Sequence, residues 1–209
     1  FLSGHVADIT GEGTPELLLL ASSPQQGTWI YSYTVHPGIQ IEKLLDKYNI
    51  PTKQKASKAI SSETTIVYED KDHELIVAFG SPERKAAIID YRGNFNTKVV
   101  GKNFLKNNVG PIILKTADFN KDGISDIYIL SNGSIKEEKI YVSPLFVSQK
   151  TTTINIPKKI KDIYFLSKKE EKQQKIILLE DSSIYVDLWK KSFDVQEKDL
   201  FKIPWCQSN

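Results

Sequence analysis

The chain has no methionine, one cysteine and three histidines among its 209 residues. The lone Cys206 excludes an internal disulfide. His5, His36 and His73 are scattered and do not have the spacing of a histidine metal site. No segment resembles the strained turn that presents a nucleophilic serine. We therefore predict that the protein is not an enzyme.

Long hydrophobic runs and an excess of one charge are also missing. The longest apolar run, Leu17–Ala21, has the length of a strand, whereas a membrane-spanning helix needs about 18 residues. Lys and Arg number 28 against 26 Asp and Glu, which leaves a net charge of +2. That balance argues against nucleic-acid binding, which needs clustered basic residues. With 40% hydrophobic residues, we expect one domain over residues 1–209 and no membrane span.

Short apolar segments, rich in β-branched and aromatic residues, are separated by turn residues, and this pattern predicts an all-β fold. The segments fall into four groups of four. The predicted strands are Leu2–Val6, Glu16–Ala21, Thr28–Val35 and Gln40–Leu45; Thr64–Glu69, Glu74–Phe79, Lys85–Tyr91 and Phe95–Val100; Pro111–Thr116, Asp126–Leu130, Glu138–Val142 and Thr152–Ile156; and Lys161–Leu166, Lys175–Glu180, Ile184–Trp189 and Phe193–Glu197.

Each group begins about 50 residues after the one before it. A four-stranded antiparallel meander repeated at this interval is typical of β-propeller blades. We predict four blades, over residues 1–51, 60–101, 110–157 and 160–203. Propellers run from four to eight blades, so the four predicted here complete a small propeller or form part of a larger one.

An acidic loop stands between the first two predicted strands of the third group. Oxygen donors recur at every second position, and the backbone carbonyl of Ile124 fills the remaining one; the set is Asp118, Asn120, Asp122, Ile124 and Asp126. Gly123 stands where the loop must reverse. Hard cations such as Ca²⁺ take such oxygen ligands. An EF-hand would carry Glu at the twelfth loop position, which is Ile129 here, so the loop leads into a strand instead.

A degenerate copy of this loop occurs 110 residues earlier, at the same place in the first group. Its matching positions are Asp8, Thr10, Glu12, Thr14 and Glu16, with Gly13 at the reversal. We predict a second, weaker calcium site there. The corresponding turn in the second group is expected to be too short for a full loop, and the Lys-rich connection in the fourth group, 167–175, would repel a cation.

The motif Asp118-x-Asn120-x-Asp122-Gly123-x-x-Asp126 resembles the FG-GAP/VCBS repeat of integrin-α-like β-propellers. The segment Asp8-x-Thr10-Gly11-Glu12-Gly13-x-x-Glu16 is similar to a variant of that repeat, with Glu12 where the family has Asp. The resemblance implies a structural Ca²⁺ in each loop and a propeller of seven or eight blades, of which this chain would be a part.

The resemblance also implies a non-enzymatic interaction module that binds a protein partner or a surface glycan. The expected setting is extracellular, at the cell surface or periplasmic; a scaffold subunit in a cytoplasmic complex is the alternative. Trp29, Tyr31 and Tyr33 alternate on one strand and share a face. That face either packs against a neighbouring blade or forms a platform for a ligand, in which case the protein would be a carbohydrate-binding propeller or the accessory domain of a polysaccharide-active enzyme.

Overall fold

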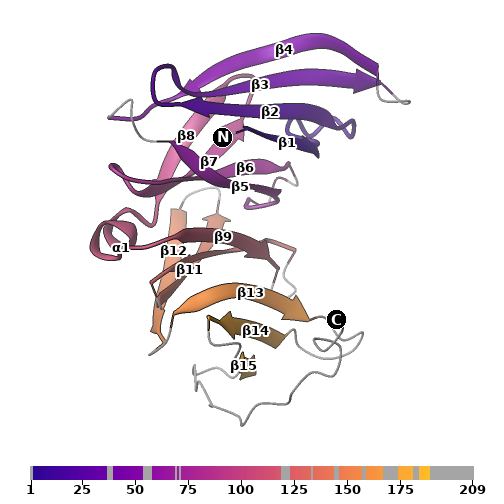
Figure 1. Ribbon diagram of the computed structural model, residues 1–209. Coiled ribbons are helices and arrows are strands. Elements are labelled where there is room, and N and C mark those ends of the chain that lie inside the picture. Colours follow the sequence, from indigo (N-terminus) through magenta and orange to yellow (C-terminus); the bar gives the residue numbers. More distant parts are fainter. Residues whose placement is uncertain are drawn as a thin grey trace, which may run out of the picture.

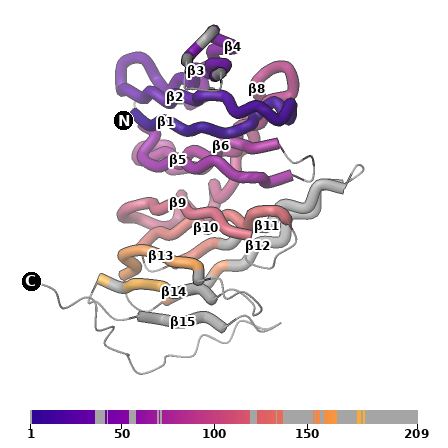
Figure 2. Tube along the Cα trace, turned by 90° about the vertical axis from the view of Figure 1, so that its right-hand side faces the viewer, coloured from indigo at the N-terminus to yellow at the C-terminus, as the bar shows by residue number. Residues whose placement is uncertain are grey.

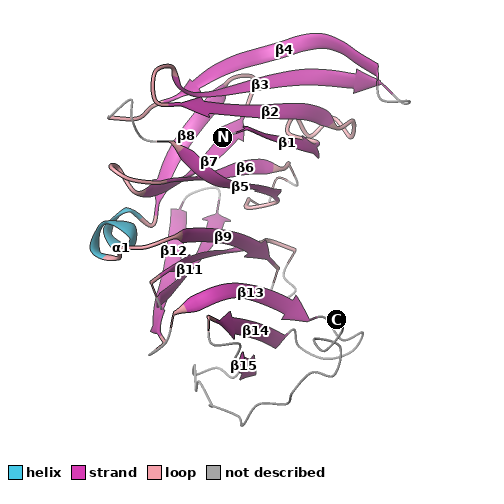
Figure 3. Cartoon of the chain, viewed as in Figure 1, coloured by secondary structure: helices cyan, strands magenta, loops and turns pink. Residues whose placement is uncertain are grey.

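The computed structural model describes residues 2–36, 40–53, 58–68, 70, 72–118, 123–132, 134–143, 146–156, 159–166, 174–180 and 184–188. Within them the fold is all-β, with four antiparallel sheets and one short helix (Figures 1 and 3). No helix in this part of the chain is long and apolar enough to cross a membrane. The predicted all-β class is confirmed.

Each sheet is formed by strands that follow one another in the sequence. The first contains β1 (Leu2–Ala7), β2 (Glu16–Ser23), β3 (Gly27–His36) and β4 (Gln40–Ile50). The second contains β5 (Ala59–Thr65), β6 (Glu74–Phe79), β7 (Lys85–Tyr91) and β8 (Phe95–Val100). The third contains β9 (Ile112–Ala117), β10 (Asp126–Ser131), β11 (Ser134–Ser143) and β12 (Phe146–Asn155), and the fourth contains β13 (Ile160–Leu166), β14 (Gln174–Leu179) and β15 (Ile184–Leu188).

One predicted strand was misplaced. The run Ile66–Tyr68, of β-branched and aromatic residues, was expected inside a strand over 64–69, but β5 ends at Thr65. Val67 and Tyr68 are nevertheless buried, because the loop after β5 turns them into the core. The predicted strand Phe193–Glu197 lies outside the described residues.

A short helix, α1 (Lys102–Asn107), connects the second and third sheets (Figure 3). Its Phe104 and Leu105 are buried between these sheets. Arg84, in the β6–β7 turn, donates to the carbonyls of Leu105 at 3.1 Å and Gly110 at 2.9 Å. The guanidinium thereby links the second sheet to the segment that enters the third.

The sheets follow one another as a stack, with the first and the fourth at opposite ends (Figures 1 and 2). Three apolar clusters fill the spaces between successive sheets. In the second and third sheets, the second strand supplies both neighbouring clusters through alternate residues: in β6, Leu75, Val77 and Phe79 belong to the first cluster, and Ile76 and Ala78 to the next. A strand buried on both faces explains the continuous apolar runs in the sequence.

The first strands of successive sheets lie side by side: β1 contacts β5, β5 contacts β9, and β9 contacts β13. Polar side chains join them along this edge. Ser62 in β5 is 2.8 Å from both the Ser3 hydroxyl and the His5 Nε2, and Lys115 in β9 pairs with Asp162 in β13 at 3.5 Å. The sheets therefore approach one another through their first strands.

Candidate cation-binding loops

The loop between β1 and β2 is organised around the carboxylate of Asp8. Its Oδ1 accepts the N–H of Gly11 at 2.8 Å, and its Oδ2 accepts the N–H of Gly13 at 2.7 Å. Both glycines have positive φ, at 72° and 82°, which favours glycine at these positions. The Gly-x-Gly pair thus bends the backbone around Asp8.

The hydroxyl of Thr10 lies between two carboxylates. Its Oγ1 is 3.4 Å from Asp8 Oδ1 and 3.3 Å from Glu16 Oε1. These are long separations for O–H···O hydrogen bonds, which average about 2.7–2.8 Å. Oxygens bound at right angles to one Ca²⁺ at 2.3–2.6 Å lie about 3.3–3.7 Å apart. Each carboxylate oxygen therefore lies at a distance from the Thr10 hydroxyl that two ligands of one Ca²⁺ would have.

Glu16 is the first residue of β2 and is only 3% exposed. Its Oε2 accepts the N–H of Ile9 at 2.9 Å, which closes the loop. Burial raises the pKa of Glu16, and the charge of Asp8 raises it further. Within the described residues, no ion pair is made by Asp8, Glu12 or Glu16.

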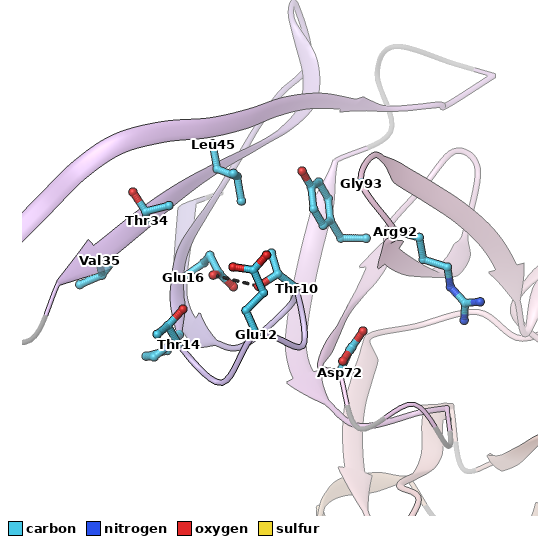
Figure 4. A pocket seen from close by; sticks show the side chains of 12 residues that line it. Thr10, Glu12, Thr14, Glu16, Thr34, Val35, Leu45, Asp72, Arg92 and Gly93 are labelled. Atoms are coloured by element: carbon cyan, nitrogen blue, oxygen red, sulfur yellow. Dashed lines mark hydrogen bonds between the residues drawn. The ribbon is translucent and has the colours of Figure 1, made fainter.

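A cavity of about 620 Å³ opens beside this loop (Figure 4). Glu12 and Thr14, which are exposed, line it together with Thr10 and the buried Glu16. The described residues contain no group of three or more His, Cys, Asp or Glu side chains with metal-binding spacing. A metal in this loop would need hydroxyl or carbonyl oxygens as well as carboxylates.

The loop between β5 and β6 has the same length as the first, contrary to the prediction that it would be too short. Val67 N–H donates to Glu74 Oε2 at 2.7 Å, across the same seven-residue separation as Ile9 and Glu16. The error followed from the misplaced strand, since β5 ends before Ile66. Ile66 stands where the first loop has Asp8, so this loop lacks the central carboxylate.

Glu74 is fully buried at the start of β6. Desolvation raises its pKa to about 8, and the charges of Asp70, Asp90 and Asp72 contribute to the shift. Its Oε1 has no hydrogen-bond partner in the described part of the chain. At neutral pH this carboxyl group is largely protonated, so it binds the loop without adding a buried negative charge.

In the second loop, an arginine side chain supplies positive charge. Arg92 lies 2.9 Å from Asp70 and 2.8 Å from Asp90, and its guanidinium is 5.7 Å from the centre of the Tyr68 ring. Asp70 is the positional equivalent of Glu12. The guanidinium thus neutralises Asp70 of the second loop and Asp90 of β7, whereas among the described residues no basic side chain forms an ion pair with a carboxylate of the first loop.

The third loop repeats the geometry of the first where the structure describes it. Gly123 N–H donates to Asp118 Oδ2 at 2.8 Å, as Gly13 does to Asp8. Gly123 has a φ of 86°, and Asp126 begins β10 with 1% exposure. Ile124 is buried, and Asn120 and Asp122 lie outside the described residues.

Equivalent loop residues also join neighbouring sheets. His73 N–H donates to the carbonyl of Asp8 at 2.8 Å, and Ser125 N–H donates to the carbonyl of Ile66 at 2.8 Å. In both pairs the donor precedes the buried acid of one sheet, and the acceptor occupies the first loop position of the sheet before it. The loops therefore lie along one rim of the stack and hold successive sheets together.

The predicted aromatic row does share one face of β3, and each ring is half-buried. The ammonium of Lys47 on β4 is 4.5 Å from the centre of the Trp29 ring and 5.4 Å from that of Tyr31. Tyr33 lies opposite Leu44 on β4. This face points away from the second sheet, because the cluster between the two sheets is formed by the alternate residue Ile30.

Sequence reasoning missed the second loop and the role of Arg92. Glu74 follows Glu16 by 58 residues and precedes Asp126 by 52, and this spacing could have aligned all three loops. Arg92 had no comparable signal, because its contacts join two turns that are distant in the sequence. A scan against protein-family models finds no match, and neither does a search of curated proteins.

Proposed function

We propose that this chain is part of a calcium-braced β-propeller that serves, without enzymatic activity, as a module for protein–protein or cell-surface contacts. Three features support the proposal: the contacts between the first strands of successive sheets, the recurring loop on one rim, and the donor geometry of the first loop. The last carries the most weight, because it points to a specific ligand.

The sheet arrangement supports propeller blades. Four-stranded meanders whose first strands meet in sequence order are arranged as the blades of a propeller are. The contacts of β1, β5, β9 and β13 follow that order. The polar contacts of Ser62 and Lys115 on these strands suit an edge that faces a central channel.

The charge of the loops supports a bound cation. Asp8, Glu12 and Glu16 repel one another within a short loop, and a divalent ion would relieve that repulsion. The contrast with the second loop strengthens this reasoning, since Arg92 supplies the positive charge there. In the third loop the three carboxylates are the shorter aspartates Asp118, Asp122 and Asp126, whereas the first loop has Glu12 and Glu16, so we propose a stronger site in the third loop.

The ion would act as a structural brace. Asp8, Thr10 and Glu16 would hold it in the first loop, with Glu12 and the carbonyl of Thr14 completing the set. The brace would fix the rim where His73 and Ser125 join adjacent sheets. We propose a calcium-rich compartment, which means extracellular, cell-surface or periplasmic; in a cytoplasmic scaffold subunit the first loop would be free of metal.

Thermal unfolding with calcium and with EDTA tests this proposal, together with metal analysis of the purified protein. Calcium at about 100 times its dissociation constant adds about 2.7 kcal/mol to the free energy of unfolding, which corresponds to a rise in Tm of about 5–10 °C for a chain of this size. Asp8→Asn and Asp118→Asn should each reduce that rise. Glu180→Gln, an exposed change outside the loops, is the matched control and should leave it unchanged. An identical Tm in calcium and EDTA would refute the calcium brace.

A carbohydrate-binding propeller, or the accessory domain of a polysaccharide-active enzyme, is the second candidate. The half-buried row of Trp29, Tyr31 and Tyr33 favours it, because aromatic faces stack on sugars. Lys47, however, lies over two of these rings. Glycan-array binding that is lost in Trp29→Ala and kept in Val109→Ala would support this candidate; no binding to any glycan would exclude it.

A further inference from the structure

The first sheet has an apolar face that no other described sheet covers. It contains Leu2 and Val6 of β1, which are 74% and 65% exposed, and Leu44 of β4, which is 43% exposed. Half-buried residues continue it across the middle of the sheet: Leu17, Leu19, Trp29, Tyr31 and Tyr33. We call these eight residues the leading face.

The register of the strands identifies what such a face packs against. Alignment of the buried acids that begin β2, β6 and β10 places Leu17 level with Leu75 and Ile127. Leu75 is buried against the first sheet, and Ile127 against the second. Leu17 and Leu19 therefore occupy positions that, in the two following sheets, contact the sheet before. The leading face is one half of an inter-sheet interface.

The fourth sheet offers the other half. Ile163 and Ile177 pack toward the third sheet, so the alternate positions face away from it. Tyr164 is one of them, is 49% exposed, and lies opposite Ile176. Leu178 is at the same register in β14 as Ala78 in β6, which packs on the sheet that follows. We call Tyr164 and Leu178 the trailing positions.

One chain cannot bring these two halves together in the observed arrangement, because the first and fourth sheets lie at opposite ends of the stack (Figures 1 and 2). We propose that the leading face binds the trailing positions of a second copy of this chain. The two copies would then continue the same sheet-on-sheet packing from one chain to the next. If both ends engage, the eight sheets close into a ring, which is within the range of known propellers.

This inference rests on the sheet stacking of the proposed propeller but does not depend on calcium. Light scattering coupled to size-exclusion chromatography, over a range of concentrations, tests it on the full chain. We expect twice the mass of one chain, or a ladder of larger species if the ring stays open. A single-chain mass at every concentration would overturn the inference.

Charge substitutions on each half make the test specific. Val6→Lys with Leu44→Lys alters exposed residues of the leading face, so the fold should survive. Tyr164→Lys alters the trailing half. Each should weaken association at least about tenfold, because a lysine would be buried in an apolar interface. Val109→Lys makes the same kind of substitution at a residue that is 67% exposed and lies outside both halves, so this control should not affect association.

The pattern among the variants distinguishes the possible contacts. Loss of association in the leading-face variant alone would mean that two leading faces meet, and would overturn the head-to-tail arrangement. Association that survives both variants would place the contact elsewhere and would also overturn it. A single-chain mass combined with a calcium-dependent Tm would refute this inference while leaving the calcium brace intact.

Discussion

The fully buried Glu74 makes stability depend on pH in a direction opposite to that of an ion-paired carboxylate. Its pKa is about 8 in the folded protein, against 4.5 for an ordinary glutamate. The folded state therefore holds the proton more tightly than the unfolded state does. Its contribution to stability is complete below pH 4.5 and is lost progressively as the pH rises to about 8.

The magnitude follows from the difference between the two pKa values. At about 1.4 kcal/mol per pH unit, the free energy of unfolding should fall by about 5 kcal/mol between pH 4.5 and pH 8. At pH 7 the loss should be about 3 kcal/mol, a large part of the 5–15 kcal/mol typical of a domain. Glu74→Gln keeps the size of the neutral carboxyl and cannot ionise, so it should remove this dependence.

Urea denaturation followed by circular dichroism, from pH 5 to pH 9 in EDTA, measures the effect. The variant and the wild type should have similar stability at pH 5. The variant should then become progressively more stable than the wild type up to about pH 8, with a constant difference above it. Glu180→Gln, an exposed control, should follow the wild type. A pH-independent difference between Glu74→Gln and the wild type would refute the proposed burial of a protonated carboxyl group.

Two further changes test the rim. Gly11→Ala should destabilise the protein by at least about 1 kcal/mol more than Gly93→Ala does, as measured by urea denaturation. Both glycines have positive φ, but only at Gly11 would a Cβ overlap the Asp72 carboxylate. Equal losses of stability in the two variants would contradict this contact. Arg92→Gln should lower the free energy of unfolding by about 1 kcal/mol at low salt and by less in 1 M NaCl, since it removes two exposed ion pairs. A loss of stability that does not depend on salt would show that packing of Arg92 on Tyr68 dominates.

The sequence allowed the sheets to be predicted because the second strand of each contains a continuous apolar run bounded by turn residues. In β6 and β10 that run is buried on both faces, whereas in β2 the face with Leu17 and Leu19 is half-buried. The first loop could also be predicted from the sequence, because Asp8 and its two glycines form a local motif whose hydrogen bonds span few residues.

The remaining features depend on contacts between distant residues. Val67 and Tyr68 are residues typical of strands, but they lie buried in the loop after β5. The sequence pattern therefore predicted this strand too far along the chain. Its true residues are mostly small and polar, and β5 is held by pairing with β6 and by contact with β9. Arg92, in the turn after β7, pairs with Asp70 in the loop before β6, and only the folded second sheet brings these two turns together.

Calorimetric titration of calcium into the metal-free protein tests the central claim most directly. The loop geometry predicts saturable binding that is weakened by Asp8→Asn and, more strongly, by Asp118→Asn, with Glu180→Gln unchanged. Absence of any binding at millimolar calcium, or binding unaffected by both aspartate variants, would contradict a calcium brace at these loops.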